Sequence, residues 1–75
     1  MAIVSSSYAM DAHTQRDGSR WVKETHVDSE GREQTCMYKL PSGQGSTEAQ
    51  ARMDARVSYL NEQLAEAEAE SILGA

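Results

Sequence analysis

Three side chains in this 75-residue sequence carry groups that bind metals or act as nucleophiles: Cys36, His26 and His13. A structural zinc site usually takes four ligands at short spacings such as Cys-x-x-Cys. One cysteine and two distant histidines do not meet that pattern, so we expect neither a metal site nor a cofactor. A Cys–His nucleophile pair also needs an orienting third group and an oxyanion hole. A chain this short has little room for such a pocket, and the sequence therefore predicts no enzyme and no small-molecule substrate.

The acidic residues do not form a pair suited to acid–base catalysis. In the strand register derived below, Glu24 and Glu33 lie on opposite faces of the sheet, whereas His26 and Cys36 share a face as diagonal neighbours. We interpret Cys36 as a small buried hydrophobic residue. Because the chain has a single cysteine, a disulfide is open only as a link to another chain in an extracellular assembly.

Residues 20–40 predict a β-hairpin, which would position these side chains. Two runs rich in β-branched and aromatic residues flank the turn Asp-Ser-Glu-Gly. Asp28 suits the first position of a type I turn, and Gly31 suits a left-handed residue that closes it with a bulge. This turn would place Val22 near Tyr38 and Thr25 near its counterpart across the hairpin, at position 35.

Neither face of that hairpin is cleanly polar. Trp21 and Met37 lie on one face, and the other carries a larger apolar set: Val22, Cys36, Tyr38 and Leu40. A sheet that covers one face with a helix normally keeps the other face polar. Two interpretations are open: a slip in the assumed register, or a second protein contact on the face that the helix leaves uncovered.

Residues 1–19 are an N-terminal arm that includes a possible strand over residues 3–10. Alternation places Val4, Ser6, Tyr8 and Met10 on its more apolar side. Asp17-Gly18 is a strong turn signal. If the strand forms, residues 3–40 make a three-stranded antiparallel meander. The alternative is a frayed N-terminal arm, and an arm that becomes ordered only against a neighbouring chain is consistent with both.

A breaker-rich linker over residues 41–46 leads into one long C-terminal helix over residues 47–73. Thr47 can cap this helix while Gln50 reaches back to it, and Gly74 supplies the stop signal. Its apolar residues form one narrow stripe of Met53, Val57, Leu60, Leu64 and Ala67. The stripe fits either the protein's own core or a seam between two or three chains.

The predicted helix is too long for the sheet. About 26 residues at roughly 1.5 Å each give a rod of roughly 40 Å, whereas an eight-residue strand spans only about 27 Å. The last turns, rich in alanine and glutamate, should therefore project beyond the strands. They form either a solvated acidic face or a surface for a basic partner, with Ile72 and Leu73 as an apolar anchor.

Size and charge limit the classes of function. Residues 1–75 form a single small domain with a thin core. Such domains usually need a disulfide, a bound metal or a partner chain to be stable. The net charge is −5, and residues 46–75 hold six acidic against two basic residues. An acidic chain repels phosphate backbones, so we expect no nucleic acid. No stretch has the roughly 20 apolar residues of a membrane span, and the first residues do not read as a signal peptide.

The chain resembles small virion structural proteins of tailed bacteriophages. The pieces that carry the resemblance run in order along the sequence: Ile3-Val-Ser-Ser-Ser-Tyr8, then Asp17-Gly18-Ser-Arg-Trp21-Val22-Lys-Glu24-Thr-His26-Val-Asp28, then Gly31, then Leu60-Asn-Glu-Gln-Leu64-Ala-Glu-Ala-Glu68. None of them is a catalytic motif. The resemblance implies a multi-copy subunit of the neck, tail or baseplate, made in the host cytoplasm and located in the virion. It carries over no functional residues.

We therefore expect an α+β fold, an antiparallel hairpin or three-stranded meander followed by one long helix, in a non-enzymatic structural protein. Its partners would be other virion proteins or copies of itself. The alternative is a small cytosolic adaptor or inhibitor that binds a basic protein through the acidic helix. The residues expected to contribute most to packing or contact are Tyr8, Trp21, Met37, Tyr38, Leu60, Leu64 and Ile72.

Overall fold

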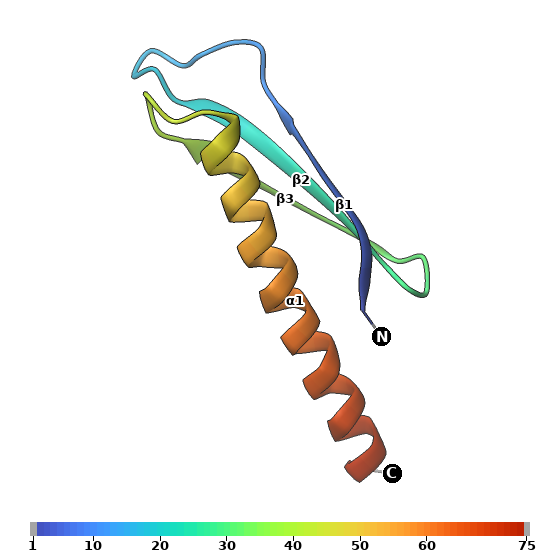
Figure 1. Ribbon diagram of the computed structural model, residues 1–75. Coiled ribbons are helices and arrows are strands. Elements are labelled where there is room, and N and C mark those ends of the chain that lie inside the picture. Colours follow the sequence, from blue (N-terminus) through green and yellow to red (C-terminus); the bar gives the residue numbers. More distant parts are fainter. Residues whose placement is uncertain (1, 75) are drawn as a thin grey trace.

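The computed structural model describes residues 2–74, with side chains over residues 2–70, and contains three strands followed by one helix. The elements are β1 (Ile3–Met10), β2 (Arg20–Asp28), β3 (Glu33–Leu40) and α1 (Ser46–Gly74). The strands form an antiparallel sheet in the order β1-β2-β3, so β1 and β3 are its edges. α1 crosses one face of the sheet and runs past its end (Figure 1). The predicted α+β class is confirmed, in its three-stranded form.

The β2–β3 register is the one that the turn predicts. Val22 pairs with Tyr38 and Thr25 lies opposite its counterpart at position 35. The Gly31 N–H donates to the Asp28 carbonyl over 3.0 Å, and Gly31 has a φ of 81°, which favours glycine. A register slip is therefore not the reason why both faces of the hairpin carry apolar side chains.

Asp28 ties the hairpin turn together and is only 4% exposed. Its Oδ1 accepts backbone N–H groups of Glu30 (2.9 Å) and Arg32 (3.0 Å), and its Oδ2 accepts the Arg32 Nε at 3.0 Å. Burial by itself raises the pKa of Asp28, but these hydrogen bonds and the guanidinium charge together outweigh it. The pKa of this carboxyl consequently lies below its ordinary value.

The lowered pKa predicts acid-sensitive folding. A depressed carboxyl pKa contributes stability that is fully present above the unfolded-state pKa of about 3.9 and is lost as the pH falls through the folded-state value. We expect Asp28→Asn to lower the free energy of unfolding at pH 7 and to flatten its decline below about pH 4. Urea titrations across pH 2–7 measure this slope. Glu62→Gln, on the exposed helix face, is the control, and equal slopes for Asp28→Asn and the parent chain would contradict the prediction.

A bulge near the start of β1 changes the predicted alternation. Ile3 pairs with Asp28 and Ser5 with Val27, so Val4 is an extra residue in the ladder. Ile3 therefore turns toward α1, while Val4 is 64% exposed. The alternation predicted for β1 is therefore interrupted at Val4, because simple alternation assumes an unbroken ladder.

The helix begins one residue earlier than predicted and has a different cap. The Ala49 N–H donates to the Gly45 carbonyl over 3.0 Å, and the Gly45 N–H donates to the Glu48 carboxylate over 2.7 Å. Gly45 thus precedes the first turn as its cap, and these two hydrogen bonds replace the capping box that was expected between Thr47 and Gln50. The Gln50 side chain instead donates to Asp54, one turn further along the helix, over 2.9 Å.

The apolar core lies where the first half of α1 crosses the sheet. Val22, Leu40 and Ala49 are almost fully buried, and Tyr8, Met10 and Tyr38 pack around them. Met53 of the predicted stripe is buried as well, and Val57, Leu60 and Leu64 are half-buried. Ala67 is exposed, so the stripe ends earlier than predicted. α1 thus covers the sheet face that carries Val22 and leaves Trp21 and Met37 on the opposite, outer face.

Candidate functional site

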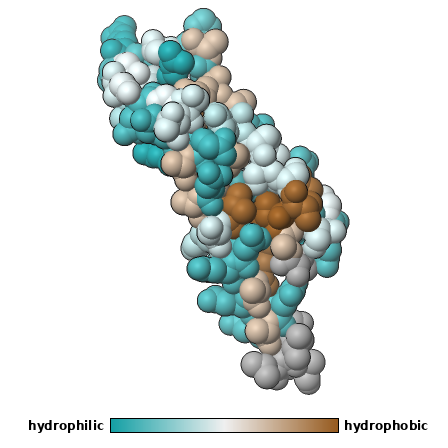
Figure 2. Space-filling model, viewed as in Figure 1, coloured by the Kyte–Doolittle hydropathy of each residue, from teal (hydrophilic) through white to brown (hydrophobic). Residues whose placement is uncertain are grey.

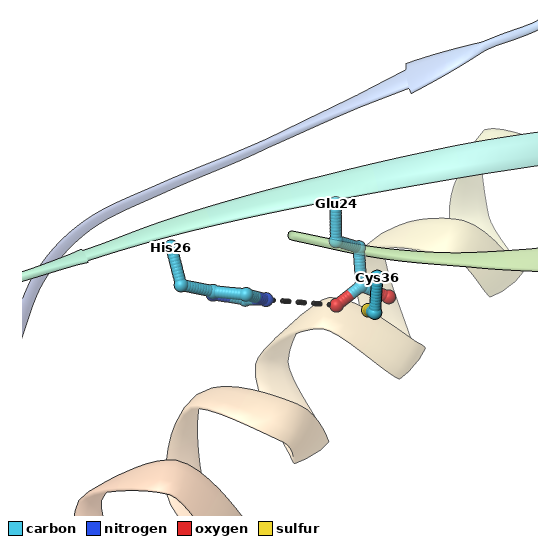
Figure 3. A group of neighbouring side chains, drawn as sticks. All are labelled: Glu24, His26 and Cys36. Atoms are coloured by element: carbon cyan, nitrogen blue, oxygen red, sulfur yellow. Dashed lines mark hydrogen bonds and ion pairs between the residues drawn. The ribbon is translucent and has the colours of Figure 1, made fainter. Parts of the chain in front are cut away.

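A cluster of titratable side chains lies between the sheet and α1, drawn in Figure 3. Glu24 and His26 are two residues apart on β2, so both point to the helix-covered face, where they are 0% and 1% exposed. Cys36 on β3 pairs directly opposite Glu24 and is half-buried. One oxygen, nitrogen or sulfur atom from each of the three lies within 4.8 Å of the other two.

Hydrogen bonds join the two β2 members of this cluster, Glu24 and His26, to β1 and to α1. His26 Nε2 lies 2.9 Å from Glu24 Oε1, and His26 Nδ1 lies 2.7 Å from the Ser6 hydroxyl on β1. Arg56 on α1 donates its Nε–H to the same Glu24 oxygen over 3.1 Å. The buried carboxylate therefore joins the sheet to the helix, with the partly exposed Arg56 as its charge partner.

Two buried oxygen atoms have no hydrogen-bond partner among the described residues: Glu24 Oε2 in the cluster and the hydroxyl of Tyr38, on the same face of the sheet. Burial and, to a lesser degree, the Glu24 carboxylate raise the pKa of Tyr38. The same two causes raise the pKa of the Cys36 thiol, which lies beside that carboxylate. At neutral pH the thiol keeps its proton, and a protonated thiol is a poor nucleophile.

Sequence reasoning placed His26 and Cys36 as diagonal neighbours on one face, and the structure brings them together. His13 lies away from them, exposed in the loop between β1 and β2. The sequence reasoning did not predict that Glu24 forms a cluster with His26 and Cys36. The i, i+2 spacing of Glu24 and His26 was a usable signal, whereas the approach of Arg56 from α1 had no signal in the sequence.

The outer face of the sheet carries exposed apolar side chains. Trp21 is 37% exposed and Met37 is 61% exposed. The Lys39 ammonium lies 5.2 Å from the centre of the Trp21 ring, at cation–π distance. A shallow hollow of about 200 Å³ on this face is lined by Ala9, Met10, Asp11, Trp21, Lys23 and Met37. The face thus combines exposed apolar side chains with the basic Lys23 and Lys39 and the acidic Asp11.

The predicted packing and contact residues fall into three groups. Tyr8 and Tyr38 pack under α1, and Arg52 lies 4.9 Å above the Tyr38 ring. Trp21 and Met37 lie on the outer face, away from the helix. Leu60 and Leu64 lie half-buried on α1. The side chain of Ile72, the remaining predicted contact residue, lies outside the described residues.

The last part of α1 projects beyond the sheet. The Ile3 N–H donates to the Asn61 side chain over 2.8 Å, which marks where the start of β1 meets the helix. Figure 2 shows a strongly apolar band across the molecule and a more hydrophilic helix surface beyond it. From Asn61 to Gly74 the helix continues for about 20 Å. We call residues 62–74 the helix arm; it carries four glutamates and no lysine or arginine.

α1 has the length of a membrane span but not the apolar character, so the described residues contain no helix that could cross a bilayer. No protein-family model matches the chain, and comparisons with curated proteins and with solved structures gave no significant match.

Proposed function

We propose that this protein is a non-enzymatic structural subunit that works by assembling in many copies. The supporting observation is the helix arm, which extends about 20 Å past the sheet and leaves Leu64 half-buried. A compact chain of this length has a radius of gyration of about 11 Å. The value here is 15.1 Å, in a molecule 52 Å long and 18 Å across. An elongated shape with a small core favours stabilisation by neighbours.

The partner that fits the surface best is a second copy of the same chain. The outer sheet face offers Trp21 and Met37 next to the basic side chains of Lys23 and Lys39. The helix arm offers the acidic side chains of Glu62, Glu66 and Glu70. Opposite charges on two different surfaces steer one copy's arm onto another copy's sheet, and the apolar side chains supply the contact area.

Such a contact is heterologous, because it joins two different patches rather than one patch to itself. Heterologous contacts build closed rings when the rotation closes and filaments when it does not. Rings and stacked tubes are the geometry of a phage neck, tail or baseplate. The resemblance to small virion proteins of tailed bacteriophages agrees with this proposal, and we therefore propose the virion as the place where the chain functions.

A charge-swap mixing experiment tests the arm-to-sheet contact. One variant combines Lys23→Glu with Lys39→Glu, and the other combines Glu62→Lys with Glu66→Lys. Alone, each variant opposes like charges at the contact and should sediment as a monomer. Mixed in equal amounts, the acidic sheet of the first meets the basic arm of the second, and assembly should return. Sedimentation velocity of the parent chain, both variants and the mixture measures this directly.

The matched control is Glu30→Lys with Arg32→Glu, which changes charges at the exposed hairpin turn and should leave assembly unchanged. Circular dichroism confirms that each variant is folded. A parent chain that stays monomeric at high concentration would overturn the proposal, as would a mixture that sediments like its separate components.

The excess of glutamate on the helix arm supports a second candidate function, an adaptor or inhibitor that binds a basic protein. Exposed charges are screened over about 8–10 Å at physiological ionic strength, so this binding would weaken steeply with salt. Repeating the sedimentation of the parent chain at two salt concentrations distinguishes the two functions, because the adaptor predicts a monomeric parent chain at both.

A further inference from the structure

Beyond its proposed structural role, we propose that the Glu24–His26–Cys36 cluster binds one zinc ion. The site would use one carboxylate oxygen, one imidazole nitrogen and one thiolate sulfur, all presented under α1 by two neighbouring strands (Figure 3). This proposal concerns the helix-covered face of the sheet, whereas the assembly contact concerns the outer face. Either proposal can therefore fail without the other.

The donor set is one that zinc prefers. Zinc in proteins binds cysteine sulfur at about 2.3 Å and histidine nitrogen or carboxylate oxygen at about 2.0–2.2 Å, in a tetrahedral arrangement. Such a tetrahedron separates its ligand atoms by roughly 3.3–3.6 Å. The three donors here lie within 4.8 Å of one another, so small side-chain rotations suffice to bring them onto an ion. Thiolate and imidazole also favour zinc over magnesium or calcium.

The unpartnered oxygen of Glu24 is a second observation that points to a ligand. Glu24 is fully buried, yet its Oε2 accepts no hydrogen bond from the described residues. A buried carboxylate oxygen without a donor carries a desolvation cost that a cation removes. Arg56 is bonded to the other oxygen, Oε1, and can keep that bond while Oε2 coordinates the ion.

The proton balance of binding is simple. The Cys36 thiol loses its proton to water as its sulfur bonds to the ion, so each bound ion releases one proton. His26 gives up the 2.9 Å hydrogen bond between its Nε2 and Glu24 Oε1, presents an unprotonated Nε2 to the ion and carries its ring proton on Nδ1. The Ser6 hydroxyl, 2.7 Å from Nδ1, accepts that N–H. Ser6 would thus be a positioning residue that fixes the metal-binding tautomer.

A hollow between α1 and the sheet reaches two of the three proposed ligands, His26 and Cys36. It has a volume of about 130 Å³, and His26 and Cys36 form part of its lining together with Arg56 and Tyr59. Three protein ligands leave one tetrahedral position open, and this hollow has room for the water that would fill it.

Cobalt(II) titration of the full-length chain tests the site, because tetrahedral cobalt bound to a thiolate gives intense sulfur-to-metal charge-transfer absorption. We expect one cobalt ion per chain with this absorption, and displacement of cobalt by zinc. Cys36→Ser should abolish the charge-transfer band and weaken zinc binding by more than about 100-fold, since even outer-shell changes cost about 10- to 100-fold. Ser6→Ala should weaken zinc binding by about 10- to 100-fold and keep the band.

His13→Gln, in the exposed loop, is the matched control and should bind like the parent chain. Zinc at 100 times its Kd should also raise the Tm of the parent chain by roughly 10 °C or more. A cobalt spectrum without sulfur charge transfer would overturn the proposal. Zinc binding that survives Cys36→Ser but is lost in His13→Gln would overturn it as well, because the metal would then be bound elsewhere.

Discussion

Replacing Glu24 by alanine in metal-free buffer is expected to lower the free energy of unfolding by about 2–3 kcal/mol. Removing one partner of a buried hydrogen bond leaves the other partner unsatisfied, at a cost of about 1–3 kcal/mol. Here the loss leaves the buried His26 Nε2 without its carboxylate partner, whereas Arg56 is 39% exposed and regains water. A 75-residue domain has only about 4–11 kcal/mol of total stability. The variant should therefore lose a large fraction of its stability.

Urea denaturation followed by circular dichroism measures this effect. Glu24→Gln keeps the shape and an accepting oxygen, so we expect it to cost less than half as much as the alanine variant. Glu33→Ala is the matched control, because Glu33 is exposed at the start of β3, and its change should stay within about 0.5 kcal/mol. Equal losses for the alanine variants at positions 24 and 33 would show that the buried network contributes nothing to stability.

Leu40→Ala is expected to cost about 2–5 kcal/mol, the range for removing a large aliphatic side chain from a packed core. Leu40 is 1% exposed and packs with Val22 and Ala49 at the N-terminal end of α1. These three make up the almost fully buried apolar cluster of the described residues, so few other contacts remain to compensate for the cavity.

Leu64→Ala is the matched control for Leu40→Ala, because it removes the same atoms from a half-buried position on α1. We expect it to cost about 1 kcal/mol at concentrations where the chain is monomeric. Chemical denaturation at low micromolar concentration gives both values. A larger loss at position 64 than at position 40 would mean that the helix arm, and not the N-terminal end of α1, holds the main core.

The sequence by itself determined the local structure of this protein. The turn residues Asp28 and Gly31 set the hairpin register, because the turn type fixes which residues face each other. The apolar stripe, from Met53 to Leu64, together with Gly74 indicated one long helix, and its length already implied an overhang. The identities of the residues that share each face of the β2–β3 hairpin followed from the period of two.

Only the tertiary structure decided which face the helix covers. Both faces of the hairpin carry apolar side chains, so no local rule selects between them. Once α1 lies over Val22, the same choice buries Glu24 and His26, brings Arg56 onto the carboxylate and leaves Trp21 and Met37 outside. The bulge at Val4 was equally unpredictable, because it depends on how β1 meets both β2 and the helix. Burial is a property of the whole packed chain, and for that reason the depth of the polar cluster and its contact with Arg56 could be recognised only in three dimensions.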